Sequence, residues 1–280
     1  MGSPAPVSIA ESLQEARTLG VDRLDAQLLL ERTLARSRTW LLAHDDAPLD
    51  SPQLEALRAC LARRAAGEPL AYILGEKEFH GLLLKVDANV LVPRPDTELL
   101  VDWALELLAG ELAAVARPRV VDLGTGSGAI ALAVKHGHAA ADVLATDVSE
   151  GALAVARANA QRLGLDVVFA GGAWWQAIGP QQFQLILSNP PYIAEEDAHL
   201  AALAHEPTLA LTPGGDGLAA LRLIVAGAPA RLERGGWLLL EHGFDQADAV
   251  RALLEAHGFS EPQTRNDLAG HARCSGAHKP

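Results

Sequence analysis

The sequence predicts an α/β protein with a doubly wound, mostly parallel sheet, preceded by a small N-terminal helical domain. Two observations lead to this fold class. From Arg119 onward, short apolar runs alternate with stretches of helical spacing, which is typical of parallel strands joined by crossover helices. Residues 7–66 instead carry their apolar side chains at helical spacing. The 280 residues are enough for about two domains of roughly 150 residues each.

The first predicted domain spans residues 1–67 and consists of helices. Ser8 can cap a helix that ends near Gly20, and Ser51 can cap a later helix whose first turn holds Pro52. The domain is almost neutral, with 8 basic and 9 acidic residues, and it holds no catalytic constellation. We therefore expect it to dock a substrate. The alternative is that its helices only cover an apolar face of the second domain.

A linker of short strands or a hairpin is predicted for residues 68–92, after a boundary at Gly67. Apolar residues alternate along Leu82–Val86, and a second apolar run covers residues 90–92. The second domain, residues 93–280, begins with a proline-rich loop. Its predicted strands are the apolar runs 119–123, 143–146, 167–170, 185–187 and 237–240.

Composition and charge exclude several classes of protein. With 49% hydrophobic residues the chain is too apolar to be disordered, and Cys60 and Cys274 alone form neither a disulfide scaffold nor a zinc pair. No apolar run approaches the 18 or so residues of a membrane span. Residues 68–280 carry 15 basic against 26 acidic residues, so electrostatic repulsion argues against direct binding of nucleic acid.

The N-terminal segment Met1–Pro6 lacks the basic and apolar regions of a signal peptide, and proline at position 6 breaks the myristoylation pattern. We therefore expect a cytoplasmic protein with no membrane partner. We also expect a monomer and no metal.

A glycine-rich loop follows the first predicted strand of the second domain and precedes a helix. Its alternate glycines let a ligand approach the backbone at the positive end of that helix. Asp147, about 20 residues further on, can accept hydrogen bonds from ribose hydroxyls. The candidate cofactor contacts are Asp122, Gly124, Thr125, Gly126, Gly128 and Asp147. The pattern alone leaves three alternatives open. The loop could bind a nicotinamide dinucleotide or be a tight turn that binds no ligand, and Asp147 could only cap the next helix.

The sequence Ser188-Asn189-Pro190-Pro191-Tyr192 ends another predicted strand, at the edge where open α/β sheets place their ligands. The prolines stiffen the backbone and leave the Pro190 carbonyl free beside the side-chain carbonyl of Asn189. These two acceptors can bind one planar NH2 group, over which the Tyr192 ring can stack. We predict Asn189, Pro190 and Tyr192 as catalytic, and Asn189, Pro190, Pro191 and Tyr192 as substrate contacts. The plainer interpretation is an Asn-Pro turn with a half-buried tyrosine.

The glycine loop, Asp147 and the Asn-Pro-Pro-Tyr segment together resemble the S-adenosylmethionine-dependent methyltransferases that act on planar nitrogens, which have a Rossmann-like class I fold. Further segments extend the resemblance to the peptide chain release factor glutamine methyltransferases, over nearly the whole chain: Glu78–Gly81, Pro93–Glu98, Glu206-Pro207 and Gly214–Leu218. The resemblance implies S-adenosylmethionine as cofactor, with Asn189 also touching it. It implies methylation of the glutamine side-chain amide in the Gly-Gly-Gln motif of release factors.

Two positions depart from the pattern of that family. Ala173 stands where the family commonly has an acidic residue near the adenine, and the resemblance implies that the neighbouring Trp174 borders the adenine. Residues 274–277 read Cys-Ser-Gly-Ala in place of an apolar strand end, so we expect the last turn to be frayed or atypical.

The chemistry expected at Asn189 follows from the weakness of an amide nucleophile, whose lone pair is delocalised into the carbonyl. Asn189 and Pro190 would orient the nitrogen, and transfer of an activated methyl group then needs chiefly alignment. We expect the histidines at positions 80, 199, 205 and 242 to be structural or superficial. The alternative function is an N-methyltransferase acting on a nucleobase, against which the acidic second domain counts.

Overall fold

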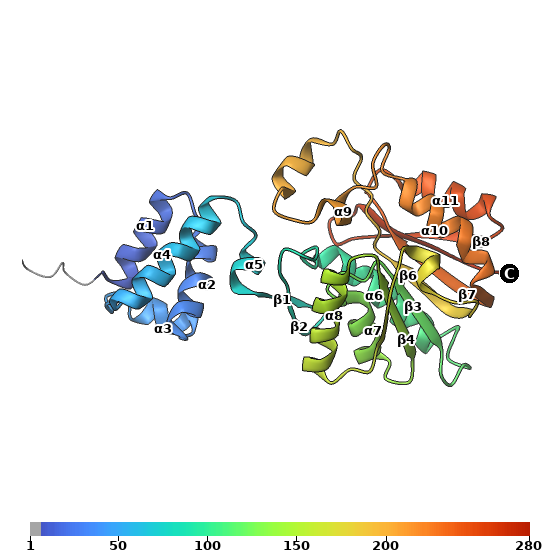
Figure 1. Cartoon of the computed structure of the whole chain (residues 1–280), viewed down its shortest axis with the longest axis horizontal. Coiled ribbons are helices and arrows are strands. Elements are labelled where there is room, and N and C mark those ends of the chain that lie inside the picture. Colours follow the sequence, from blue (N-terminus) through green and yellow to red (C-terminus); the bar gives the residue numbers. More distant parts are fainter. Residues whose placement is uncertain (1–6) are drawn as a thin grey trace, which may run out of the picture. The chain divides into compact units, whose positions relative to one another are not determined.

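The computed structural model describes residues 7–280, which belong to two compact units, Met1–Gly75 (the N-terminal unit) and Glu76–Pro280 (the C-terminal unit) (Figure 1). The predictions of no signal peptide and no myristoylation concern Met1–Pro6, which lie outside the described residues. No helix within residues 7–280 is both long and apolar enough to cross a bilayer.

The described part of the N-terminal unit is helical, as predicted. Ser8 caps the first helix in a capping box with Glu11. At the fourth helix the cap is Asp50 and not the expected Ser51, because the Asp50 carboxylate accepts the Gln53 N–H at 2.8 Å and the Gln53 side chain bonds back to Asp50 N–H. The helices are α1 (Ile9–Thr18), α2 (Arg23–Leu34), α3 (Arg38–Ala43), α4 (Ser51–Ala65) and α5 (Leu70–Leu74).

A β-hairpin, β1 (Glu76–Phe79) and β2 (Leu82–Lys85), begins the C-terminal unit. Its two-residue turn, His80-Gly81, has φ values of 48° and 78°, and positive φ at both positions is what a type I′ turn requires. The hairpin and α5 both fall in the segment predicted as a linker, and the two compact units part between them. No strand forms at residues 90–92, where the sequence also predicts one: the Val92 N–H donates to a side chain, that of Glu206, at 3.0 Å.

A seven-stranded sheet lies at the centre of the C-terminal unit, in the order β5-β4-β3-β6-β7-β9-β8. Its first five strands pair in parallel, and β9 pairs antiparallel with both β7 and β8. This topology confirms the predicted doubly wound, mostly parallel fold. The strands are β3 (Arg119–Leu123), β4 (Asp142–Asp147), β5 (Val168–Gly171), β6 (Phe183–Ser188), β7 (Leu232–Glu241), β8 (Ser260–Asn266) and β9 (Ala272–His278).

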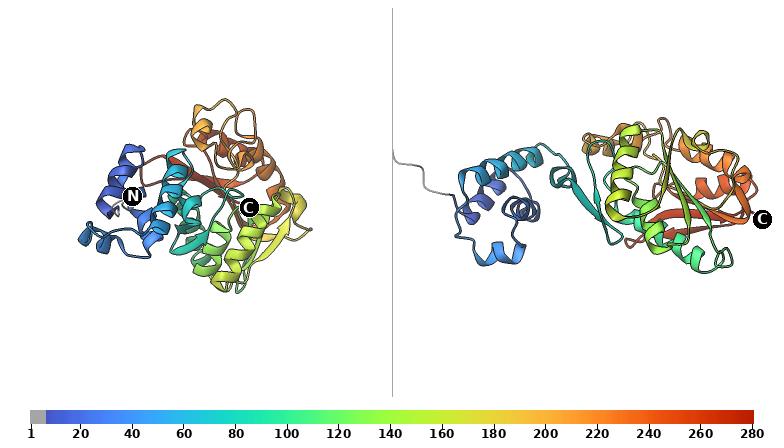
Figure 2. Two further views of the ribbon diagram at one scale, coloured as in Figure 1. Left: turned by 60° about the vertical axis from the view of Figure 1, so that its left-hand side comes forward. Right: turned by 60° about the horizontal axis from the view of Figure 1, so that its bottom comes forward.

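Helices cover both faces of this sheet, as can be followed in Figure 2. Val120 joins a buried cluster with residues of α6 and α7, whereas Val121 joins a second cluster with α10 and α11. Burial on both faces explains why the strands are continuous apolar runs in the sequence. The helices are α6 (Glu98–Ala109), α7 (Ala129–Gly137), α8 (Glu150–Leu163), α9 (Thr208–Leu211), α10 (Ala219–Gly227) and α11 (Ala247–Ala256). Short 3-10 helices are η1 (Pro95–Thr97), η2 (Trp174–Ala177), η3 (Ala198–Leu203) and η4 (Ala228–Ala230).

The last strand, β9, is fully paired, so the expectation of a frayed C-terminal turn is wrong. Cys274 to Ala277 are buried between β7 and β8. A Cβ atom at Gly276 would lie 2.4 Å from Leu239 Cδ2 and 3.0 Å from the ring of Trp103 in α6. The strand therefore carries small residues because a helix packs closely on it, and its sequence lacks the apolar run that would announce a strand.

Candidate active site

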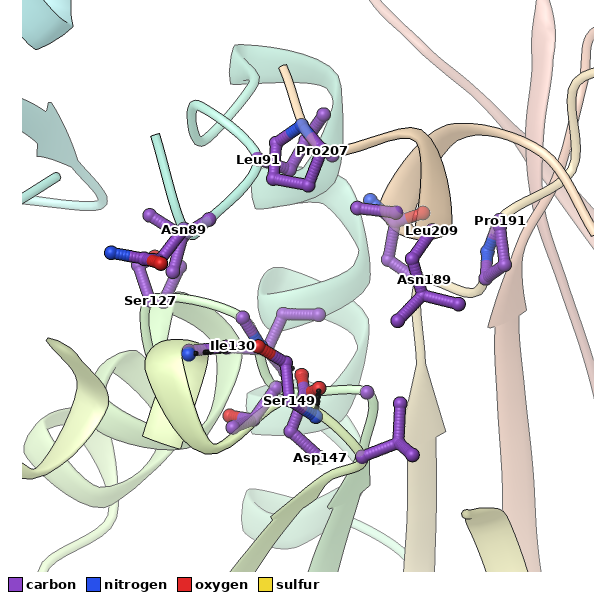
Figure 3. Close-up of a pocket in the computed structure, with 18 of the residues that line it drawn as sticks. Asn89, Leu91, Ser127, Ile130, Asp147, Ser149, Asn189, Pro191, Pro207 and Leu209 are labelled. Atoms are coloured by element: carbon purple, nitrogen blue, oxygen red, sulfur yellow. Dashed lines mark hydrogen bonds between the residues drawn. The ribbon is translucent and has the colours of Figure 1, made fainter. Parts of the chain in front are cut away.

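A cavity of about 330 Å³ opens at the carboxyl ends of β3, β4 and β6 in the C-terminal unit (Figure 3). Doubly wound sheets bind their ligands at this edge, and the volume lies within the roughly 300–1,000 Å³ typical of small-molecule sites. Figure 3 shows Asn89 and Ser127 on one side of the cavity and Asn189, Pro191 and Leu209 on the other. The cavity therefore brings residues of the glycine loop and of the Asn-Pro-Pro segment to one place.

The glycine loop lines the cavity with Gly124, Thr125 and Gly126. All three loop glycines have positive φ, 76°, 56° and 85° at positions 124, 126 and 128, which only glycine adopts readily. Gly128 is not among the described lining residues; a Cβ atom there would lie 3.0 Å from Leu132 Cδ1 and 3.3 Å from Ala156 Cβ. Gly128 thus serves close packing of helices α7 and α8.

Asp122 lies beneath the glycine loop, fully buried and outside the described lining of the cavity. Its Oδ2 accepts hydrogen bonds from the Thr125 hydroxyl at 2.6 Å and from Ala131 N–H at 3.3 Å. Burial raises the pKa of this carboxyl to about 7, although both hydrogen bonds favour the ionised form. The Asp122 carboxylate therefore connects Thr125 in the glycine loop with Ala131 in the first turn of α7.

Asp147 ends β4 and faces the cavity. Its two carboxylate oxygens accept backbone hydrogen bonds, Oδ1 from Ser149 N–H and Oδ2 from Gly126 N–H, both at 2.9 Å. The N-cap of the next helix is Ser149, which accepts from Ala152 N–H at 3.1 Å, so Asp147 is not the helix cap. Each carboxylate oxygen retains a second acceptor site that a ligand hydroxyl can use.

Trp174 borders the cavity together with Gly172 and Ala173. It has a φ of 45°, uncommon for a bulky residue, and a Cβ atom at Gly124 would lie 3.4 Å from its ring. The next residue, Trp175, turns away and donates its indole N–H to the Leu223 carbonyl at 2.9 Å. Of the two tryptophans, Trp174 is therefore the one that lines the cavity, while Ala173 adds no carboxylate.

Asn189 lines the cavity just after β6, and its side-chain amide is held from behind. Its Nδ2 donates to the Thr97 hydroxyl oxygen at 3.1 Å. Thr97 is buried in η1, within the proline-rich loop. This hydrogen bond leaves Asn189 Oδ1 as the end of the amide available to a ligand.

Pro191 also lines the cavity, whereas Pro190 and Tyr192 are not among the described lining residues. Pro190 is buried, and the half-buried Tyr192 donates its hydroxyl to Glu241 Oε1 at 3.2 Å. Burial raises the pKa of the Tyr192 hydroxyl well above its usual range. The structure thus places the tyrosine hydroxyl against a buried carboxylate at the end of β7.

The proline-rich loop is tied to the segment before α9 by a buried carboxylate. Glu206, with a side chain only 2% exposed, forms an ion pair with Arg94 and accepts the Val92 N–H. Arg94, Pro207 and Leu209 line the cavity.

Sequence reasoning did not identify Thr97 or Glu241 as site residues. A signal for Glu241 exists: it is an acidic residue directly after the apolar run 237–240, the position that Asp147 occupies on its own strand.

The described lining of the cavity contains no histidine. His80 Nε2 lies 2.9 Å from Asp102 Oδ1, and the buried His242 bonds the Gly243 carbonyl and the Ser275 hydroxyl, both at 2.8 Å. Burial lowers the pKa of His242, which favours the neutral imidazole. No group of three or more potential metal-ligating side chains occurs within residues 7–280.

Two families match most of the chain. Residues 8–75 match the PrmC N-terminal domain, and residues 98–251 match the methyltransferase small domain. A release factor glutamine methyltransferase from Bordetella pertussis is 54% identical, covering 92% of this chain and 96% of the relative. A release factor glutamine methyltransferase from Burkholderia pseudomallei is 48% identical, and the match covers 99% of this chain and 98% of the relative.

Solved structures share the fold of most of this chain at low sequence identity. A 16S rRNA methyltransferase from T. thermophilus, in complex with AdoMet and guanosine, matches with a TM-score of 0.56 and 21% identity, covering 73% of this chain and 50% of that one. A methyltransferase from Pyrococcus furiosus matches with a TM-score of 0.52 and 20% identity, and the match covers 71% of this chain and 89% of that one. These likenesses support the Rossmann-like methyltransferase fold.

Proposed function

The chain belongs to the release factor glutamine methyltransferase family, and we propose that it transfers a methyl group from S-adenosylmethionine to a glutamine of a peptide chain release factor. The acceptor is the side-chain amide nitrogen of the glutamine in the Gly-Gly-Gln motif. One observation carries the proposal: Asn189 presents an oriented carbonyl acceptor in the same cavity as the glycine loop.

The cavity fits S-adenosylmethionine, which supplies a methyl group activated by a sulfonium. The backbone of Gly124 to Gly126 and the start of α7 would hold its charged end, because helix N-termini favour carboxylates. Asp147 would accept the ribose hydroxyls, and Trp174 would contact the adenine. Asp122 and Gly128 would act indirectly, by holding the loop in shape.

The acceptor glutamine would place its amide NH2 against Asn189 Oδ1. A hydrogen bond to this oxygen would orient the nitrogen. A second bond to the Pro190 carbonyl stays a prediction, because Pro190 is buried and is not among the described lining residues. Holding reactants in alignment contributes up to about 7–11 kcal/mol to a displacement of this kind. The described lining of the cavity contains no histidine, and the product nitrogen would release its proton to water or to a nearby acceptor.

Tyr192 would act on the site through the backbone that carries Asn189. Its hydroxyl bonds Glu241 and its carbonyl accepts from Gln246 Nε2 at 2.9 Å, so the residue is anchored at two points. Stacking of its ring over the substrate amide stays a prediction, and it would require the ring to turn toward the cavity.

The N-terminal unit would dock the release factor away from the methylated glutamine. A tripeptide offers little area for recognition, since stable protein contacts bury on the order of 1,200–2,000 Å². Affinity gained at a remote surface can align a reacting group elsewhere. We further infer that the protein works in the cytoplasm as a monomer. We also infer that it does not bind nucleic acid directly, because its net charge of −12 repels a polyanion.

Methyl transfer with radiolabelled S-adenosylmethionine tests the proposed function. The purified protein is incubated in parallel with release factor and with ribosomal RNA. Label in the release factor and not in the RNA is expected. Label in the RNA alone would favour the nucleobase methyltransferase.

A further inference from the structure

A buried asparagine in helix α8, Asn159, joins the glycine loop to the β-hairpin. Its side chain is fully buried and forms three hydrogen bonds, all to main-chain atoms. Asn159 Nδ2 donates to the Ser127 carbonyl of the glycine loop at 2.9 Å and to the Lys85 carbonyl of β2 at 3.0 Å. Asn159 Oδ1 accepts the Lys85 N–H at 2.7 Å. One side chain therefore connects two segments that lie far apart in the sequence.

The three partners determine the orientation of the Asn159 amide. A main-chain carbonyl can only accept a hydrogen bond, so both carbonyls must face the NH2 group of the side chain. The Lys85 N–H can only donate, so it must face the side-chain oxygen. Turning the amide by half a turn would oppose like groups in all three contacts. The side chain is therefore held in one orientation, and it holds its partners in turn.

The peptide group between Ser127 and Gly128 is fixed at both ends. Its carbonyl accepts from Asn159, and its N–H donates to the Thr125 carbonyl at 2.9 Å. Gly128 has a φ of 85°, and because glycine has no Cβ atom it allows this peptide group other orientations as well. Asn159 therefore supplies a restraint that the glycine itself does not provide.

Three main-chain N–H groups beside this peptide group are available to a ligand. Within residues 7–280, the N–H groups of Ser127, Ala129 and Ile130 have no hydrogen-bond partner, and all three residues line the cavity (Figure 3). Unpaired N–H groups at the start of a helix attract a carboxylate. A Ser127 carbonyl turned toward the same place would repel it.

We propose that Asn159 is a positioning residue for cofactor binding: by holding the Ser127 carbonyl, it keeps the start of α7 in the conformation that receives the carboxylate of S-adenosylmethionine. This inference rests on the proposed function, which assigns this part of the cavity to the cofactor. Asn159 is not among the described lining residues, so its effect passes through Ser127 and Gly128.

The variant Asn159→Leu of the full-length chain tests the inference. Leucine has a similar size but forms no hydrogen bond, so the Ser127 carbonyl is released. Isothermal titration calorimetry should find a Kd for S-adenosylmethionine weakened about 10-fold. With saturating cofactor, kcat toward release factor should stay within about 3-fold of wild type, because Asn189 and its partner Thr97 are unchanged. A merely structural role would lower the thermal stability and leave the Kd unchanged.

Arg162→Ala is the matched control. Arg162 also lies in α8 and donates to a main-chain carbonyl of β2, that of Leu83, but within residues 7–280 it has no hydrogen bond to the glycine loop. The control variant thus removes a contact between the same helix and the same strand without releasing Ser127. Its cofactor Kd should remain within about 2-fold of wild type.

Hydrogen exchange of the wild-type protein tests the inference without any variant. Exchange at the Lys85 N–H requires its bond to Asn159 to open, which loosens the side chain that also holds Ser127. Saturating S-adenosylmethionine favours the held conformation and should slow exchange at Lys85. It should have less effect on Gly81 of the same hairpin, whose N–H donates to Glu78 at 2.7 Å.

Three results would overturn the inference while the wild type binds S-adenosylmethionine. They are a Kd for Asn159→Leu within about 2-fold of wild type, an equal loss of affinity in Arg162→Ala, or equal slowing of exchange at Lys85 and Gly81. If Asn159→Leu does not fold, the exchange measurement decides alone. A wild type that binds S-adenosylmethionine but does not methylate release factor would overturn the proposed function and leave the role of Asn159 standing, whereas a wild type that does not bind it would overturn both.

Discussion

Replacing Asp147 by alanine should weaken cofactor binding without unfolding the protein. The carboxylate now accepts Ser149 N–H and Gly126 N–H, both at 2.9 Å, and keeps free lone pairs that face the cavity. In Asp147→Ala the ribose hydroxyls would lose the charged acceptor that we propose for them, and the Gly126 N–H would lose its hydrogen bond to the Asp147 carboxylate.

The size of the effect follows from the kind of hydrogen bond that is lost. Bonds to a charged group contribute about 1.5–3 kcal/mol, which corresponds to a roughly 10-fold to 100-fold weaker Kd for S-adenosylmethionine. Asp142→Ala is the matched control, because Asp142 begins the same strand and only pairs with Arg117 on the surface. Exposed ion pairs contribute about 0–1 kcal/mol, and this one lies at the opposite end of the strand from the cavity.

Isothermal titration calorimetry with S-adenosylmethionine measures Kd for both variants, and thermal unfolding without cofactor measures their stability. A Kd for Asp147→Ala within about 2-fold of wild type would remove Asp147 from the cofactor site. An equal loss of affinity in Asp142→Ala would show that the effect is not local to the cavity.

Three further predictions concern the amide site, the loop and the N-terminal unit. Asn189→Ala should lower kcat at least about 100-fold, because the substrate amide loses its oriented acceptor, while calorimetry should find a nearly unchanged cofactor Kd. Burial raises the pKa of Asp122 from 3.8 to about 7, so the folded protein holds the proton of this carboxyl more tightly than the unfolded chain does. The protonated carboxyl therefore stabilises the folded wild type at low pH, and this stabilisation is lost as the pH rises through about 7. Denaturant unfolding should therefore find Asp122→Asn gaining stability relative to wild type between pH 4 and 7, by at most about 1.4 kcal/mol per pH unit. A chain beginning at Glu76 should still bind S-adenosylmethionine, but kinetics should show a larger loss with whole release factor than with a Gly-Gly-Gln peptide.

Each of these has a result that contradicts it. Turnover of Asn189→Ala at a tenth of wild type or better would exclude Asn189 as the acceptor. A stability difference independent of pH would show that the Asp122 carboxyl titrates normally. Equal losses on protein and peptide would remove the docking role of the N-terminal unit.

The sequence predicts the parallel strands and the glycine loop because both leave local signals. Strands buried on two faces are apolar runs, and three alternate glycines have few uses other than a loop with positive φ. Strands β8 and β9 leave no such signal, since β8 is largely polar and β9 is built from small residues that fit beneath Trp103. Their place in the sheet depends on packing that local periodicity does not describe.

The candidate site was predictable only where its residues lie beside a recognisable strand end. Asp147 is the last residue of a buried strand and Asn189 directly follows another, and both line the cavity. Thr97 lies 92 residues from Asn189, and only the fold brings the two side chains to 3.1 Å. The hydrogen bond that holds the Asn189 side chain therefore belongs to tertiary structure, as does the burial of Glu241.

The most direct test of the central claim is to locate the transferred methyl group by mass spectrometry. Release factor is incubated with the purified protein and S-adenosylmethionine, digested, and its peptides are fragmented. We expect a mass increase of one methylene group on the glutamine side chain of the Gly-Gly-Gln motif, absent when Asn189→Ala replaces the wild type. Methylation of another residue, or an unmodified motif after prolonged incubation, would contradict the proposed function.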